Sequence, residues 1–191
     1  MTNPFQDERT AAARLPDDDV VALLLDQHAR IRELFAITRR ARGASRQRAF
    51  DELRALLAVH EAAEELIVRP VAKRTAGPEE ADARNAEERE ASEVLRKLEG
   101  MDVRGPDFEE VLAEFERAVG EHAEHEEREE FPAIVTHLMP DRRQAMGARL
   151  RRAEHLAPPH PHPSVAGSPA AVALTGPFAA MVDKARDAIG R

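Results

Sequence analysis

The side chains best able to do chemistry in this 191-residue chain are its 8 histidines and 36 carboxylates, because it contains no Cys, Tyr or Trp. Their absence excludes disulfides, thiolate metal sites, cysteine nucleophiles and an aromatic radical carried by a phenol or an indole. Imidazole and carboxylate groups together are ligands that suit iron, manganese or zinc. Any metal chemistry in this chain must therefore use nitrogen and oxygen donors.

Two stretches of the chain share a histidine, a glutamate and a proline at one spacing. His60, Glu64 and Pro70 recur 62 residues later. The matching residues are His122, Glu126 and Pro132. A separation of four residues puts both side chains on one helix face, about 6 Å apart along the axis. An imidazole there can bind one metal while the carboxylate reaches a second metal roughly 3.5 to 4 Å away.

Hydrophobic residues spaced three and four apart predict four helices that would position these groups. The approximate ranges are 17–42, 46–70, 78–100 and 107–132. Each apolar stripe also carries a titratable residue, which is costly to bury unless it is paired. These inward residues are His28, His60, Glu64, Glu88, His122 and Glu126. A single histidine on an apolar face is usually an ordinary core residue, but titratable residues on all four helices favour a shared metal site.

The pattern predicts an all-α chain. No stretch alternates with the two-residue period of a strand, and short connections join the four helices, so we expect an antiparallel up-down-up-down four-helix bundle. We expect a flexible N-terminal arm at 1–16, the bundle at 17–138, and a C-terminal extension at 139–191. The extension should hold an Arg-rich helix, a Pro- and His-rich linker, and a short helix from Phe178 to Ile189.

The fourth helix carries further histidine and glutamate residues beside His122 and Glu126. His125 lies three residues after His122 and beside Glu126, so it could face the same cavity and replace a ligand missing from the third helix. Most of the acidic run 121–130 is expected to be a solvated helix face. This expectation covers Glu124, Glu127 and Glu130. The Glu-x-x-His spacing of ferritin-like bundles and the His-Glu-x-x-His motif of zinc proteases are both absent from the chain.

The charge distribution and hydropathy exclude two classes of function. The net charge is −8, and residues 107–132 hold 11 acidic and 2 basic residues, a sum of −9. No basic face of similar density offsets this block, so we expect no nucleic-acid partner. No apolar run is long enough for a secretory signal or a membrane span, so a cytoplasmic protein without a membrane partner is expected.

The motifs resemble those of the hemerythrin-like, or HHE cation-binding, family over about residues 17–138. The resemblance consists of the lone histidine on the first helix, His-Glu-Ala-Ala-Glu-Glu at 60–65, and His-Ala-Glu-His-Glu-Glu at 122–127 with Phe131-Pro132 after it. It implies a four-helix bundle with two non-heme iron ions bridged by the two motif carboxylates. The implied ligands are His28, His60, Glu64, His122 and Glu126. Glu61 is a further candidate, since some members use the residue directly after the second-helix histidine.

The third helix departs from the family pattern. Members usually supply one or more histidines there, whereas this chain has Glu87-Glu88-Arg89-Glu90, of which Glu88 fits the apolar stripe best. A site richer in carboxylate favours ferric iron, which argues against reversible O₂ transport. We therefore expect a protein that reacts with or senses O₂, peroxide or nitric oxide, with oxidase-like or peroxidase-like activity as one outcome. Without a phenol or indole, turnover would need an external reductant.

Two alternatives from other classes remain. One is a non-catalytic metal-binding protein, such as an iron store, or a bundle that holds zinc or a single iron; manganese is a further candidate metal. The other is a metal-free regulatory interaction bundle that works through its C-terminal helices. A monomer or a weak homo-oligomer is expected in every case. Metal analysis separates the two-iron hypothesis from both alternatives.

Overall fold

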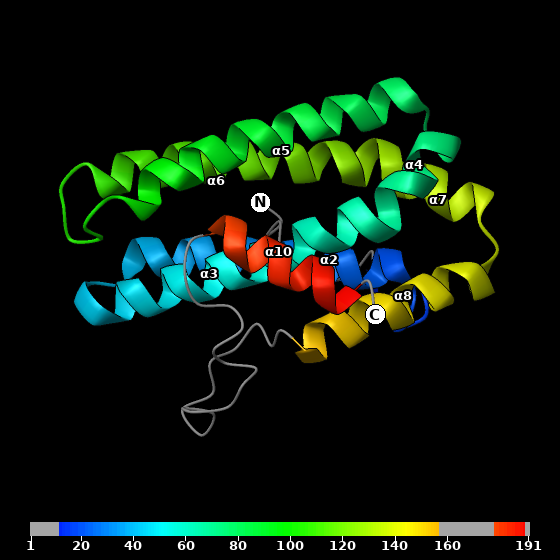
Figure 1. Cartoon of the computed structure of the whole chain (residues 1–191), viewed down its shortest axis with the longest axis horizontal. Helices are drawn as coiled ribbons and strands as arrows, with labels where there is room; N and C mark the ends of the chain where they lie inside the picture. Colours follow the sequence, from blue (N-terminus) through cyan, green and yellow to red (C-terminus); the bar gives the residue numbers. More distant parts are fainter. Residues whose placement is uncertain (1–11, 157–177, 190–191) are drawn as a thin grey trace.

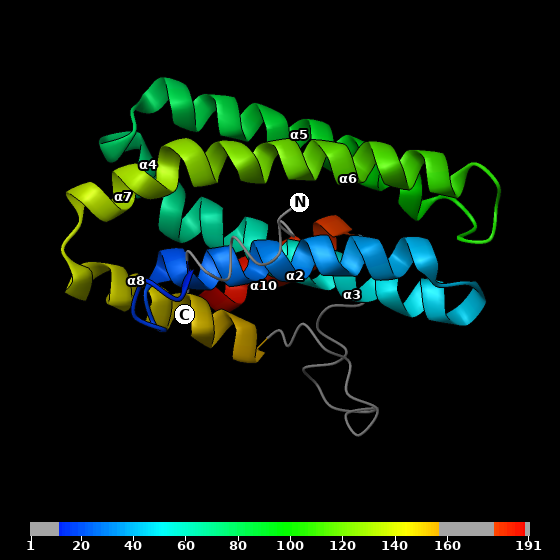
Figure 2. The ribbon, with the colours of Figure 1, turned by 180° about the vertical axis from the view of Figure 1, so that it is seen from behind.

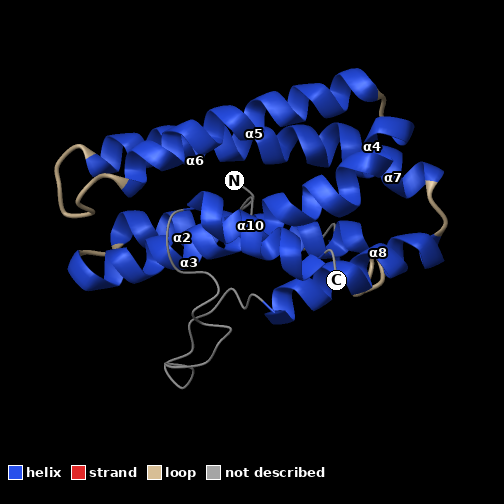
Figure 3. Cartoon of the chain, in the orientation of Figure 1, coloured by secondary structure: helices blue, strands red, loops and turns tan. Residues whose placement is uncertain are grey.

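The structure is a computed structural model that describes residues 12–156 and 178–189, and every regular element in these ranges is helical (Figure 3). Most of the expected arm at 1–16 and all of the Pro- and His-rich linker at 157–177 lie outside the described residues. Within the described ranges, no helix is both long enough and apolar enough to cross a membrane.

Four long antiparallel helical rods form the bundle (Figures 1 and 2). The first rod is α2 (Val20–Arg40), and the third is α5 (Pro78–Glu99). The second consists of α3 (Gly43–Ala63), the π-helical turn η1 (Glu64–Val68) and α4 (Arg69–Thr75). The fourth consists of α6 (Phe108–His125), the π-helical turn η2 (Glu126–Glu130) and α7 (Phe131–His137). The expected all-α up-down-up-down bundle is confirmed.

Local sequence explains where the first and third rods begin. The carboxylate of Asp19 accepts a hydrogen bond from the backbone N–H of Val21 and caps the start of α2. Gly77 has a φ of 113°, a value that favours glycine, and Pro78 follows it in the first turn of α5. The third helix therefore begins where the sequence predicted, at Pro78 directly after Gly77.

The predicted ends of the second and fourth helices were wrong, because both rods continue through their prolines. In each π turn the backbone N–H reaches five residues back, from Arg69 to the carbonyl of Glu64 and from Phe131 to that of Glu126. Each proline then lies in the first turn of the next α segment, where its missing N–H breaks no helical hydrogen bond. The prolines thus follow a change of helix type rather than ending the helix.

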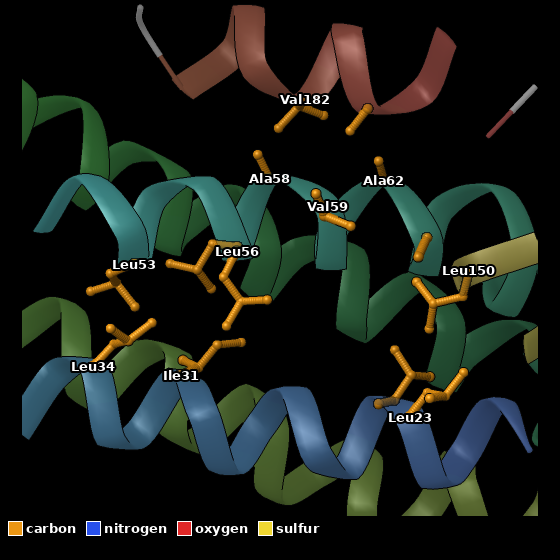
Figure 4. Close-up of a cluster of buried hydrophobic side chains, with 14 of the residues drawn as sticks. Leu23, Ile31, Leu34, Leu53, Leu56, Ala58, Val59, Ala62, Leu150 and Val182 are labelled. Carbon is orange, nitrogen blue, oxygen red and sulfur yellow. The ribbon is translucent and has the colours of Figure 1, made fainter. Parts of the chain in front are cut away.

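The C-terminal extension places its described helices on the outside of the first two rods (Figure 1). It contains α8 (Pro140–Leu156) and α10 (Phe178–Ile189), at the positions the sequence predicted. Figure 4 shows Val182 of α10 lying over Ala58 and Ala62 of α3, and all three side chains are buried. The small alanines let the two helices approach closely, so α10 covers the second rod.

The other helix of the extension, α8, is anchored to the start of α2. Arg143 forms a buried ion pair with Asp19 at 2.6 Å. The backbone also approaches so closely that a Cβ added to Gly147 would lie 2.0 Å from the carbonyl oxygen of Asp18. Glycine is therefore required at this crossing, and α8 is held in one position against α2.

Candidate metal centre

The six inward side chains predicted from the sequence meet in the middle of the bundle. They form two groups, and within each group one ligand atom per residue lies within 4.8 Å of the others. The first group is His28, His60, Glu64 and Glu126, and the second is Glu64, Glu88, His122 and Glu126. Both groups contain the same two glutamates, one from each repeat. The arrangement can therefore accommodate two cations that share two carboxylates.

Imidazole nitrogens and carboxylate oxygens face one another across this centre. His60 Nε2 lies 3.0 Å from Glu64 Oε1 and 3.1 Å from the Nε2 atom of His28. His122 Nε2 lies 3.5 Å from Glu126 Oε1 and 3.7 Å from Glu64 Oε2. The three histidines are thus directed at the shared glutamates from three different helices.

Several of these atoms are buried without a hydrogen-bond partner. They are Glu64 Oε1, Glu126 Oε1 and Oε2, and His122 Nε2. Buried polar atoms in folded proteins almost always have partners, so a cluster of unsatisfied ones needs an explanation. Oxygen and nitrogen lone pairs that point at a common space are what a hard or borderline cation needs. The residues present fit a metal.

Each histidine is oriented by a hydrogen bond at its outer nitrogen. His28 Nδ1 donates to Glu127 Oε1 at 2.7 Å, and His60 Nδ1 donates to Gln27 Oε1 at 2.8 Å. His122 Nδ1 donates to Glu87 Oε2 at 3.1 Å. A proton on Nδ1 leaves the Nε2 lone pair free and pointing inward, which is the arrangement typical of metal-binding histidines.

A buried arginine balances part of the negative charge. Arg69 forms a short ion pair with Glu88, lies 2.8 Å from Glu130 Oε1, and is 3.8 Å from Glu126 Oε1. Burial opposes the charged form of Arg69, but Glu64 and the three carboxylates around it raise its pKa above the usual value. One guanidinium is therefore shared by carboxylates that would otherwise repel one another.

The two shared glutamates have opposite pKa shifts in the metal-free protein. Burial and the charge of Glu64 raise the pKa of Glu126 well above its ordinary value. Burial also disfavours ionised Glu64, but the positive charges of His60 and His122 outweigh it and hold the pKa of Glu64 well below the ordinary value. The centre thus favours one ionised and one protonated carboxyl, and a cation would favour ionisation of both.

The structure does not bring Glu61 and His125 into either group. Glu61 lines a cavity beside the centre, where burial and the charges of Glu88 and Glu64 raise its pKa to about 7. His125 is partly exposed, and its Nδ1 donates to Glu87 Oε1 at 2.8 Å. His125 therefore helps to hold the carboxylate that orients His122.

Two glutamates expected on a solvated face are not there. Glu130 is fully buried against Arg69, and Glu127 is half-buried between His28 and Arg32. The repeat could have indicated Glu130, because the residue 62 positions earlier is the buried Val68. No comparable signal in the sequence identifies Arg69, Gln27 or the role of Glu127, since their partners come from other helices. Glu124 is exposed, as expected.

An apolar cavity adjoins the centre. Its free volume is about 60 Å³, enough for a few water-sized molecules. Its apolar wall is formed by Ile31, Phe35, Leu57, Ala91, Leu95, Phe115 and Val119. Five candidate ligands of the centre also line the cavity: His28, His60, Glu64, Glu88 and His122. A polar groove between the second rod and α5 also adjoins this cavity, because Glu61, Glu88 and Ser92 line both.

Comparisons with known proteins agree with this architecture. The family model described as Hemerythrin HHE cation binding domain matches residues 19–134. An uncharacterized hemerythrin-like protein from Schizosaccharomyces pombe is 29% identical over 134 residues, which make up 69% of this chain and 66% of that protein.

A crystal structure also shares the fold. It is that of a hemerythrin HHE cation binding domain-containing protein from Mycobacterium kansasii, which matches with a TM-score of 0.66 and 20% identity. The match covers 96% of this chain and 99% of that one. Since the family model matches more than half of the sequence, the chain belongs to the hemerythrin HHE cation-binding family.

Proposed function

We propose that this protein holds two iron ions and reacts with or senses O₂, peroxide or nitric oxide. The observation that carries the proposal is the sharing of Glu64 and Glu126 by two ligand groups, with unsatisfied lone pairs directed between them. A single-metal site would need neither the second group nor two shared carboxylates. Membership of a cation-binding family supports the same interpretation.

The roles of the residues follow from their positions. His28 and His60 would hold one iron, Glu88 and His122 would hold the other, and the two shared glutamates would bridge them. When bound, the iron pair supplies Lewis acidity and one-electron redox chemistry to a small ligand. Glu127, Gln27 and Glu87 keep the three imidazoles in the orientation that leaves Nε2 free.

The surroundings of the centre suit a small ligand. The cavity beside it has a mainly apolar wall and has room for a diatomic molecule or peroxide. Phe131 stacks on His28 with ring centroids 5.6 Å apart, and phenylalanine is not a ready electron donor. Because the chain has no Tyr, Trp or Cys, repeated turnover would draw electrons from an external reductant.

Metal analysis of protein produced with iron tests this proposal. We expect two irons per chain, a near-ultraviolet absorption from an oxygen bridge between them, and a spectral change when peroxide or nitric oxide is added. Stoichiometric zinc or manganese with no such absorption would instead indicate the non-catalytic metal-binding alternative. If the chain binds no metal at any metal concentration tested, the metal-free interaction bundle is the remaining interpretation.

A further inference from the structure

A residue of the C-terminal extension is connected to the centre by two consecutive hydrogen bonds. Glu154 Oε1, in the last turn of α8, accepts from Gln27 Nε2 at 2.7 Å. Gln27 Oε1 in turn accepts from His60 Nδ1 at 2.8 Å. Glu154 lies 20 residues beyond the region 19–134 that the family model matches, so this connection is a property of this chain's extension.

Gln27 cannot orient His60 by itself. The amide of a glutamine has an acceptor and a donor that exchange places when the group turns over. With its oxygen toward the ring it selects the Nδ1–H tautomer of His60, and with its nitrogen toward the ring it selects the Nε2–H tautomer. The second tautomer would place a hydrogen on the atom that lies 3.0 Å from Glu64 Oε1 and remove the lone pair a metal needs.

Glu154 resolves this ambiguity. An ionised carboxylate only accepts hydrogen bonds, so it requires the nitrogen end of Gln27 to face it and the oxygen end to face His60. His28 and His122 need no such third residue, because they donate directly to the carboxylates Glu127 and Glu87. His60 is the one ligand histidine among the described residues whose partner is an amide.

The position of Glu154 is not explained by the stability of its own helix. A carboxylate in the last turn interacts unfavourably with the partial negative charge at a helix C-terminus. The helix nevertheless holds it in place, because Arg143 pairs with Asp19 and Gly147 lies against the backbone of Asp18. The anchored α8 thus presents an acceptor to a buried glutamine on α2.

We propose that Glu154 is a positioning residue of the metal centre: through Gln27 it selects the tautomer of His60 that leaves Nε2 free to bind metal. The C-terminal extension is then part of the site and not only a cover of the bundle. The purpose of this arrangement rests on the proposed metal-binding function, but the tautomer itself can be measured without a metal.

Nuclear magnetic resonance of the metal-free full chain, labelled with ¹⁵N and held at a pH where His60 is neutral, tests the proposal directly. The His60 signals are identified by their loss in His60→Ala. We expect wild-type His60 to carry its proton on Nδ1, and Glu154→Ala to shift the ring substantially toward the Nε2–H form. Glu154→Gln keeps the size of the side chain but can turn a donor toward Gln27, so it should also shift the ring toward the Nε2–H form. An unchanged tautomer in Glu154→Ala would overturn the proposal.

Zinc binding provides a second readout, with Glu124→Ala as the control because it removes one exposed carboxylate without a contact to the centre. Loss of an outer hydrogen-bonding partner weakens metal binding by about 10–100-fold. We expect Glu154→Ala to weaken the binding of one of the two zinc ions about tenfold and to spare the other, and Glu154→Gln to weaken binding of the same ion because its amide is no longer an acceptor only. In a Gln27→Leu background, Glu154→Ala should cause no further loss, whereas an additive loss would contradict the pathway through Gln27.

The two experiments separate the two proposals. If wild-type protein binds no pair of metals, the proposed function fails, while the tautomer measurement still decides the role of Glu154. If two metals bind but the tautomer does not respond to Glu154→Ala, the metal centre stands and the positioning role fails. Circular dichroism of each variant checks that α8 and the bundle remain folded, and Glu154→Gln keeps the comparison informative if Glu154→Ala loosens α8.

Discussion

The Nε2 atoms of His28 and His60 face each other at 3.1 Å inside the bundle, and the Nδ1 atom of each ring donates to a different partner. If both rings are neutral, two lone pairs meet at that distance and repel. The contact becomes favourable only when a cation or a proton lies between the nitrogens. The stability of this contact should therefore depend on whether a metal ion or a proton is bound between the two nitrogens.

Metal stoichiometry should depend on which ligand is removed. His28 belongs to one ligand group, whereas Glu126 belongs to both. We expect His28→Ala to reduce the metal content from two ions per chain to one, and Glu126→Ala to reduce it to none. Elemental analysis of purified protein measures this, with Glu124→Ala as the control that keeps two. Equal metal content in His28→Ala and Glu126→Ala would contradict the shared-carboxylate arrangement.

The stability of the metal-free protein should fall as the pH rises from about 4.5 to about 7. Folding raises the pKa of Glu61 from its ordinary 4.5 to about 7, mainly by burial and then by the charges of Glu88 and Glu64. Glu65 adds to the effect, and Arg186 opposes it. A raised carboxyl pKa means that the folded state prefers the protonated form, so ionisation costs stability, here about 3 kcal/mol across that range.

Urea unfolding of the metal-free chain across this pH interval measures the effect. Glu61→Gln cannot ionise, and its free energy of unfolding should therefore decline less with pH than that of wild type. Other buried carboxyls contribute to the slope in both proteins, so the difference between the two slopes is the informative quantity. Parallel slopes would show that Glu61 ionises without cost in the folded chain.

Loss of Arg69 should destabilise the metal-free protein more than the metal-loaded one. Arg69→Met leaves Glu130 and Glu88 buried or half-buried without their cation, and breaking a buried pair in this way costs about 3–5 kcal/mol. Bound metal ions supply positive charge to the same cluster, so the penalty should shrink when zinc is present. Urea midpoints with and without zinc measure it. Lys73→Met is the control, because Lys73 is exposed and 3.7 Å from Asp82.

Gly120 should control access to the cavity. It lies within α6, lines the cavity, and a Cβ added there would meet nothing within 4 Å. Gly120→Ala should therefore stabilise the protein by about 1 kcal/mol through helix propensity alone. Gly120→Leu should fill part of the cavity and slow azide binding to the iron-loaded protein, as measured by stopped-flow absorbance. Equal azide rates in the Ala and Leu variants would show that ligands enter elsewhere.

Gly147→Ala should have the opposite effect on stability, although it is the same substitution in another helix. The added methyl would overlap the carbonyl of Asp18, and neither backbone can move without disturbing the Arg143–Asp19 ion pair. We expect a loss of about 1–3 kcal/mol, the usual cost of overpacking. Thermal unfolding compares it with Gly120→Ala. A neutral Gly147→Ala would mean that α8 can shift away from α2 without cost.

The sequence was sufficient for the bundle and for the six inward residues, because both follow from periodicity along single helices. The three-residue and four-residue spacings show which face of a rod is inward, and the 62-residue repeat shows that two rods present the same pair of ligands. The continuation of the two rods through Pro70 and Pro132 was not predictable in this way, since a π turn leaves no simple periodic signal.

The supporting residues depend on how the rods are rotated against each other. Arg69 reaches α5 and η2, Gln27 reaches α3 and α8, and Glu127 reaches α2. Each is polar and could equally well have faced water on its own helix. Pairing across helices is decided by packing that no single helix encodes, so these partners became visible only in the structure.

The two π turns begin at the shared glutamates and occupy equivalent positions of the repeat, 64–68 and 126–130. A π turn contains one residue more than the corresponding α turn, and one residue rotates an α-helix by about 100°. Deleting a single residue from either segment would return that turn to the α form and keep both halves of the rod in phase, but it would place the proline inside an uninterrupted α-helix, where its ring clashes with the carbonyl four residues back. Substitutions at exposed positions between glutamate and proline should be tolerated, whereas a change in the number of residues between them should not.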